Sequence, residues 1–127
     1  MTHQCVNRGP AAEAVERSLA AISARENDVR AWVALGPEEA AREAAAAIDT
    51  IDATPDELPL RGTTLGVKDI FDTADYPSRY GSSIFAENRP TSDAAAVALL
   101  RSSGSVCLGK TVTAELASTL GLARPVG

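Results

Sequence analysis

The feature that most constrains how this chain folds is a short apolar run with one lysine in it. Residues 65–70 read Leu-Gly-Val-Lys-Asp-Ile and follow the turn signal Pro-Leu-Arg-Gly at 59–62. A nearly continuous apolar run of this length is typical of a strand buried on both faces, which needs strands and helices around it. Lys68 interrupts the run. Burying a lone ammonium group is costly unless the group is paired or gives up its proton.

Lys68 therefore has two interpretations. Desolvation shifts lysine side chains toward the neutral amine, which is the form that acts as a general base at working pH. In the alternative, Lys68 ends its strand and its side chain reaches solvent, which the spacing alone favours. Asp69, the next residue, either holds the lysine in a charge pair or helps to end the strand.

Length and charge restrict the class of protein. The 127 residues suit one domain, and 12 Lys and Arg against 17 Asp and Glu give a formal net charge of −5. No stretch gathers basic residues into a phosphate-neutralising patch, so we expect no nucleic-acid binding. A small substrate or a protein partner fits better. The chain shows neither a signal-peptide apolar segment nor an apolar run near about 18 residues, so we expect a cytoplasmic protein without membrane contact.

Cysteine and histidine usage argues against several kinds of site. Cys5 and Cys107 are far apart and lack the spacing of metal ligands, so they predict no metal site. Cys107 lies in an apolar run, which is typical of a small buried hydrophobic residue. The one histidine, His3, lies in the polar N-terminal tail, so a Ser-His-Asp or Cys-His mechanism would lack its base.

Two helices are predicted before the lysine-containing run. Residues 1–9 read as a disordered tail, and Pro10 suits the first position of a helix that reaches about Arg25. A second helix is expected to begin at Glu38 after Gly-Pro, with acidic residues in its first turn. Its buried face is expected to contain Ala40, Ala44, Ile48 and Ile51.

The second half of the chain predicts an α/β fold. Strands are expected at 63–70 and 105–108, separated by a long irregular stretch at 71–91 and a helix that Ser92 or Asp93 caps and Gly104 ends. A further short helix is predicted at 114–118, and 119–127 as an unstructured tail. This order favours a mostly parallel sheet. Two strands do not make a stable sheet alone, so the fold is expected to be incomplete.

One nucleotide-binding motif matches by letters alone. Residues 104–111, Gly-Ser-Val-Cys-Leu-Gly-Lys-Thr, fit the P-loop pattern. That motif needs a strand before its first glycine and a loop between its glycines. Here the middle of the match is itself the predicted strand, which argues against a P-loop. Lys110 then either faces the region of Lys68 or marks a solvated strand end, and the second is favoured.

The ordered set of motifs resembles the N-terminal part of the amidase signature family over residues 11–118. The matching segments are 59–62, 65–69, 80–82, 93–101, 104, 108–111 and 115–117. The resemblance implies an α/β fold with a mixed, mostly parallel sheet flanked by helices. Residues 10–118 would form the N-terminal part of an amidase domain.

The resemblance also implies a chemistry. Family members hydrolyse carboxamide C–N bonds with a Ser–cis-Ser–Lys triad, and their lysine matches Lys68. Both family serines lie in a Gly/Ser-rich segment after the Gly-Lys-Thr strand, and nothing in this sequence matches that segment. Ser82, Ser83 and Ser118 do not occupy those positions; serines beside Gly81 are typical of ordinary loops.

We therefore expect a truncated N-terminal amidase segment, inactive by itself, that arose naturally, by a frameshift or by deliberate shortening. Its substrate would be a small-molecule amide in full-length relatives. One alternative is a fragment of the A-type subunit of a glutamine-dependent tRNA amidotransferase. Another is a non-catalytic remnant that binds a partner, such as a complementary C-terminal chain, through its open sheet edge.

Overall fold

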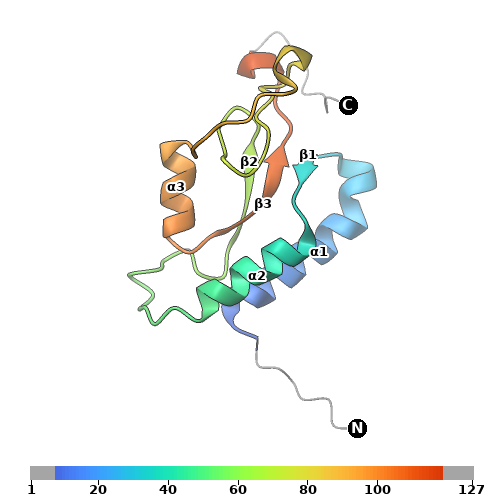
Figure 1. The fold of residues 1–127 in the computed structure, drawn as a ribbon. Coiled ribbons are helices and arrows are strands. Elements are labelled where there is room, and N and C mark those ends of the chain that lie inside the picture. The colour runs from blue at the N-terminus through green and yellow to red at the C-terminus, as the bar shows by residue number, and fades with distance from the viewer. Residues whose placement is uncertain (1–7, 119–127) are drawn as a thin grey trace.

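The computed structural model describes residues 8–118, which form a three-stranded sheet between two layers of helices (Figure 1). The strands lie in the order β1-β3-β2, with β2 parallel and β1 antiparallel to β3. The expected α/β class with a mixed sheet is confirmed. In chain order the elements are α1 Pro10–Val29, β1 Trp32–Leu35, α2 Glu38–Asp49, β2 Thr64–Lys68, η1 Ser83–Phe85, α3 Ala95–Ser102, β3 Val106–Thr111 and η2 Glu115–Ala117. Of the predicted tails at 1–9 and 119–127, all but residues 8 and 9 lie outside the described residues.

Helix α1 begins as its sequence predicts and ends later. Pro10 occupies the first turn, where its missing N–H leaves no bond unmade. The Asp49 carboxylate, at the end of α2, accepts hydrogen bonds from the free N–H groups of Ala11 and Ala12 at 3.0 and 2.9 Å. A negative charge at this helix end is favourable because of the helix dipole. The helix continues to Val29 rather than stopping near Arg25.

The core between α1, α2 and the sheet consists of small side chains. Ala11 and Val15 of α1 meet Ala41 and Ala45 of α2, and these helices cover Val106 and Leu108 of β3. The predicted buried face of α2 is right at Ile48, which packs against this core, and wrong at its other positions. Ala40 and Ala44 are exposed, and Ile51 lies beyond the helix with 47% of its surface exposed. An alanine-rich helix has nearly equal side chains around it, so its buried face is poorly marked.

Strand β1 is a third strand that the sequence does not predict. Its four residues, Trp32–Leu35, follow α1 in the chain and pair with β3, so that β1 forms one edge of the sheet. The Glu26 carboxylate accepts hydrogen bonds from the N–H groups of Ala31 and Trp32, at 3.2 and 3.0 Å, and fixes the turn between α1 and β1. With β1 in place, β3 is the central strand of this sheet.

Helix α3 lies on the opposite side of the sheet from α1 and α2 (Figure 1). Its end at Gly104 is confirmed, since that glycine adopts φ +103°. Its predicted cap is wrong. The residue before the helix is Ala94, and Asp93 instead accepts a hydrogen bond from the N–H of Ala74 at 2.9 Å. The predicted helix at 114–118 is only the short turn η2.

An irregularity in β3 decides which side chains face which layer. The pairing of β2 with β3 skips Leu108, so that Leu65 pairs with Cys107 and Gly66 with Gly109. After this bulge the alternation of side chains is reversed. Leu108 faces the helical core, and Lys110 pairs with Val67 on the opposite face.

We expect Gly109→Ala to destabilise the domain by about 2–3 kcal/mol, because a Cβ at this position would overlap the carbonyl group of Ala34 in β1. Gly66→Ala is the matched control. There the atoms nearest to the Cβ would belong to side chains rather than to the backbone, namely those of Thr111 and Trp32 at 2.9 Å, so we expect a smaller loss. Urea unfolding of both variants measures the difference. Equal stabilities would contradict the described register.

Candidate active site

Lys68 is the last residue of β2 and its side chain is exposed. It pairs with Thr111 of β3, so both side chains lie on the face of the sheet that carries Gly66. Among residues 8–118 the Lys68 amine has no hydrogen-bond or ion-pair partner. Of the two interpretations of Lys68, the described structure therefore shows the second: Lys68 ends its strand and its side chain reaches solvent.

The buried lysine is Lys110, whose side chain is 0% exposed. Its Nζ lies 2.9 Å from Asp69 Oδ1 and donates hydrogen bonds to the Phe71 carbonyl oxygen at 2.9 Å and to Ser78 Oγ at 2.8 Å. The expectation of a solvated strand end is wrong, and Lys110 does not share a face with Lys68. The bulge at Leu108 turns Lys110 toward the 71–91 segment instead.

Asp69 follows the end of β2 as expected, but it forms an ion pair with Lys110 rather than with its neighbour Lys68. Its carboxylate is fully buried against Lys110 and also accepts hydrogen bonds from the N–H of Arg79 at 3.3 and 3.4 Å. A charge pair between Asp69 and Lys68 was one expectation, and it is absent from the described structure. This partnership between β2 and β3 is a feature that the sequence does not reveal.

The irregular segment 71–91 is held in place by polar contacts. The Tyr80 hydroxyl donates to Asp72 at 2.5 Å and accepts from the Asn88 amide at 3.1 Å, and the Asn88 carbonyl accepts from the N–H of Ser78 at 3.0 Å. The Asp72 carboxylate, together with partial burial, raises the pKa of Tyr80. Tyr80 also donates its N–H to the carbonyl of Asp69, which attaches the segment to the end of β2.

Ser82 and Ser83, the two serines after Gly81, take no part in a site with Lys68 in the described structure. Ser82 is buried and its Oγ accepts the N–H of Ile84 at 3.4 Å, which caps η1. Ser83 is exposed. Neither is close enough to Lys68 to form a hydrogen bond with it. The P-loop match fails as expected, because Val106–Thr111 is strand β3 rather than a phosphate-binding loop.

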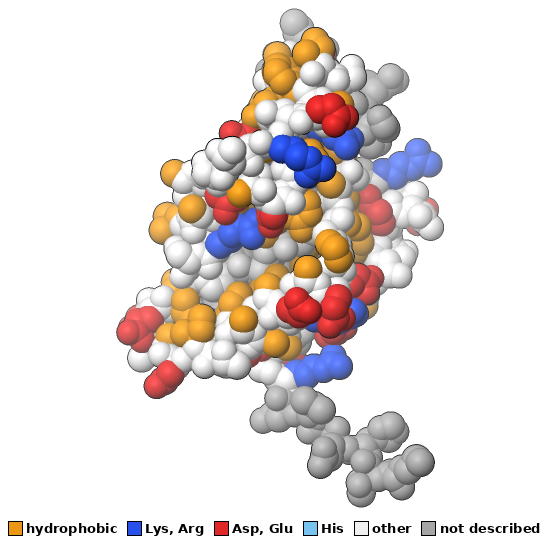
Figure 2. Space-filling view, in the orientation of Figure 1, with side chains coloured by type: hydrophobic (Ala, Val, Ile, Leu, Met, Phe, Trp, Pro, Cys, Tyr) orange, Lys and Arg blue, Asp and Glu red, His pale blue; other side chains and the backbone are white. Residues whose placement is uncertain are grey.

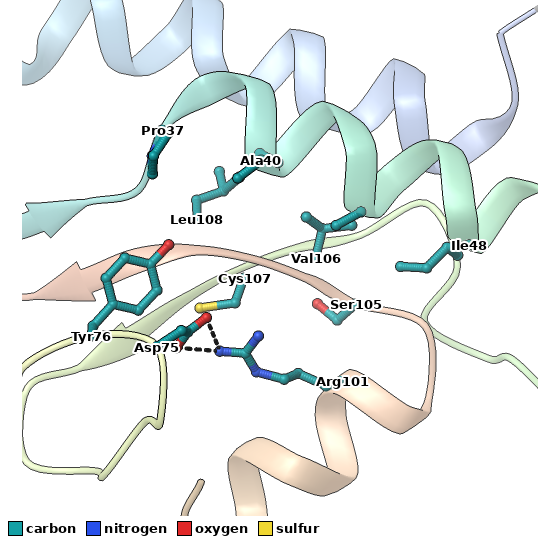
Figure 3. Close-up of a pocket in the computed structure, with 12 residues that line it drawn as sticks. Pro37, Ala40, Ile48, Asp75, Tyr76, Arg101, Ser105, Val106, Cys107 and Leu108 are labelled. Atoms are coloured by element: carbon teal, nitrogen blue, oxygen red, sulfur yellow. Dashed lines mark hydrogen bonds and ion pairs between the residues drawn. The ribbon is translucent and has the colours of Figure 1, made fainter. Parts of the chain in front are cut away.

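A separate pocket lies between α2 and α3 over the start of β3 (Figure 3). Ala40 and Ile48 of α2 line one wall, and Cys107 of β3 also lines the pocket. On the other wall, Arg101 donates to both oxygens of Asp75 at 2.9 Å. That carboxylate neutralises the guanidinium. The pocket lies toward the start of β3, whereas Lys68 pairs with its last residue, so the pocket is not part of the Lys68 site.

We expect Cys107 to react with iodoacetamide more than tenfold more slowly than glutathione does at pH 8. Burial raises the pKa of the Cys107 thiol. A raised pKa leaves less thiolate at a given pH, and the thiolate is the form that reacts. Mass spectrometry of timed samples measures the rate, and the thiol exposed by urea is the control. Cys107 is half-buried rather than fully buried as its apolar run predicts, and reaction at the rate of glutathione would contradict even this partial burial.

The described residues hold no group of three His, Cys, Asp or Glu side chains that could bind a metal ion. No helix in this part of the chain is long and apolar enough to cross a membrane. On the face shown in Figure 2, Lys and Arg are scattered among apolar and acidic side chains. His3 and Cys5 lie outside the described residues.

The amidase family profile matches residues 13–126. This match covers most of the chain, so the chain belongs to the amidase family. Its structure is similar to the peptide amidase of Stenotrophomonas maltophilia, with a TM-score of 0.69 and 29% identity over 83% of this chain and 22% of that chain. A chain from a vestigial complex described as revealing the origins of an s-triazine catabolic enzyme gives a TM-score of 0.72 with 32% identity, over 86% of this chain and 24% of that one.

The chain is similar to curated proteins of at least two kinds. A protein of Mycobacterium tuberculosis (strain ATCC 25618 / H37Rv) named as an amidase, AmiD, is 36% identical over 104 residues, which is 82% of this chain. The A-type subunit of the glutamyl-tRNA(Gln) amidotransferase of Salinispora arenicola (strain CNS-205) is 39% identical over 108 residues, 84% of this chain. The chain spans 22% of the length of each.

Proposed function

We propose that this chain provides the lysine-bearing part of an amidase that hydrolyses carboxamide C–N bonds, and that Lys68 is its general base. One observation carries the proposal. Of the two lysines at the paired ends of β2 and β3, Lys110 is enclosed by three acceptors, whereas the Lys68 amine is without a partner in residues 8–118. Only an amine with a free lone pair accepts a proton.

In the proposed reaction Lys68 acts in its uncharged form. A serine hydroxyl attacks the amide carbonyl, and its proton passes through a second serine to Lys68 Nζ. The tetrahedral intermediate then collapses, the C–N bond breaks, and the amine leaves with the proton that Lys68 returns. Water releases the acyl group in a second cycle of the same transfers. No metal or organic cofactor takes part.

Both serines of this Ser–cis-Ser–Lys triad, and the N–H groups that would stabilise the oxyanion, belong in this proposal to the part of the enzyme beyond the present sequence. Removing nucleophile and oxyanion hole together costs many orders of magnitude in rate. We therefore expect the 127-residue chain by itself to release no ammonia from amides above the background rate.

Co-expression with the rest of a relative tests the proposal. The partner is the Mycobacterium tuberculosis amidase without the 104-residue segment that matches this chain. We call the resulting complex the assembled amidase; the same split of the mycobacterial protein alone is the control that shows reassembly. Release of ammonia from benzamide and acetamide is measured. An active control with an inactive assembled amidase would contradict the proposal.

A second candidate is the A-type chain of an amidotransferase, which obtains ammonia from glutamine. The observation in its favour is the 39% identity to the Salinispora amidotransferase chain, which exceeds the 36% identity to the mycobacterial amidase. Glutamine is therefore included among the assayed amides. Glutamine hydrolysis that exceeds benzamide hydrolysis by tenfold or more, when the Salinispora protein supplies the rest of the enzyme, favours the second candidate.

A further inference from the structure

The ammonium group of Lys110 has each of its three N–H donors matched to an acceptor. Ser78 donates its hydroxyl hydrogen to the carbonyl of Phe71 at 3.4 Å, so its oxygen accepts the hydrogen bond from Lys110. The Phe71 carbonyl and the Asp69 carboxylate also only accept. A neutral amine has just two donors, so this environment fits the charged form. Lys110 is therefore a fixed cation and not a base.

Asp69 is held by every polar group it has. Its N–H donates to the Thr111 carbonyl at 2.9 Å, and its own carbonyl accepts from the Tyr80 N–H at 3.0 Å. Its carboxylate takes Lys110 on one side and the Arg79 N–H on the other. Asp69 is thus attached to β3 by its backbone and by its side chain. These hydrogen bonds of its N–H and carbonyl groups fix the position of its backbone.

Lys68 is bonded directly to this fixed residue. The carbonyl of Lys68 accepts the N–H of Phe71 at 3.0 Å, and the carbonyl of Phe71 is in turn an acceptor for Lys110. The Lys110 ammonium group is therefore hydrogen-bonded to the turn that follows Lys68. We propose that Lys110, acting through Asp69 and the Phe71 carbonyl, is a positioning residue that fixes the direction of the Lys68 side chain. This inference rests on the proposed role of Lys68 as the base.

Stability alone does not account for an ion pair at this place. A buried pair of charges stabilises a fold no better than apolar side chains of the same volume, and often less. The rate of a reaction, in contrast, depends strongly on the direction of a catalytic side chain, because a displacement of about 1 Å between reacting groups costs about 100-fold in rate. An ion pair with three defined hydrogen bonds fixes one geometry, which apolar contacts do less strictly.

The first test uses the 127-residue chain by itself. Amide hydrogen exchange is measured at Asp69 and Tyr80 in the wild type, in Lys110→Met and in the double variant Asp69→Asn/Lys110→Met, which buries no lone charge if the single variant fails to fold. We expect exchange at both amides to be at least 30-fold faster in the variants, with little change in α1. Arg42→Met, which removes a cation from the exposed ion pairs of α2, is the control. Wild-type protection in the double variant would overturn the inference.

The second test separates positioning from folding in the assembled amidase. We expect Lys110→Met or the double variant to lower kcat per isolated complex by 10–100-fold with KM within twofold, and Lys110→Arg to recover part of the loss. An unchanged kcat per complex would overturn the positioning role. If the wild-type assembly is inactive while its control is active, the proposed function fails, and the exchange result alone decides how Lys110 acts on the end of β2.

Discussion

Replacing Lys68 with alanine should lower ammonia release by the assembled amidase by about 1,000-fold, which is the usual loss when a positioned general base is removed. The residual rate should come from substrate binding and from the oxyanion donors of the partner portion. Stability should change little, because the Lys68 side chain is exposed and makes no hydrogen bond or ion pair in the described region. The measurement is kcat per purified complex with benzamide.

Arg17→Ala is the matched control for this change. It also removes one exposed cation, but from α1, far along the sequence from the strand end. Its rate should stay within twofold of the wild type. A Lys68→Ala complex with the same kcat as this control would show that another group accepts the proton.

Replacing Lys110 with methionine should have the largest effect on stability, a loss of about 3–5 kcal/mol. The substitution leaves the Asp69 carboxylate buried at 0% exposure without its cation, and two further acceptors without their donor. Chemical unfolding of the 127-residue chain, followed by circular dichroism, measures the loss.

Lys68→Met provides the contrast within the same sheet. Lys68 is the last residue of β2 and Lys110 the last but one of β3, yet replacing the exposed Lys68 should change the free energy of unfolding by less than about 0.5 kcal/mol. Asp69→Asn/Lys110→Met should cost less than Lys110→Met alone, since neither charge is then buried unpaired. Similar losses for the two single lysine variants would contradict the burial difference between them.

The sequence predicts the order of elements and misses which lysine is buried. Regular alternation of side chains from Val106 through Leu108 would place Lys110 on the face that α1 and α2 cover, where the charge of a lysine makes its burial improbable. One skipped residue in the pairing with β2 moves it to the face where Asp69 lies. A bulge depends on strand pairing rather than on local residue preference, so a single sequence does not show it.

Strand β1 and the face of α2 were missed for related reasons. Trp32–Leu35 is a four-residue edge strand whose pairing to β3 is long-range. In α2 the buried residues Ala41 and Ala45 and the exposed Ala40 and Ala44 before them are all alanine, so the 3.6-residue period gives little contrast between these positions. The order of motifs from Pro59 to Ala117 was more informative than any element, and the family assignment based on it is confirmed.

The most direct test of the central claim is a crystal structure of the assembled amidase. The account predicts that Lys68 Nζ lies within about 3.2 Å of a serine Oγ from the partner portion, sheltered from solvent, while Lys110 keeps its contacts with Asp69. A Lys68 amine that points into solvent, with a different side chain beside the serine, would contradict it.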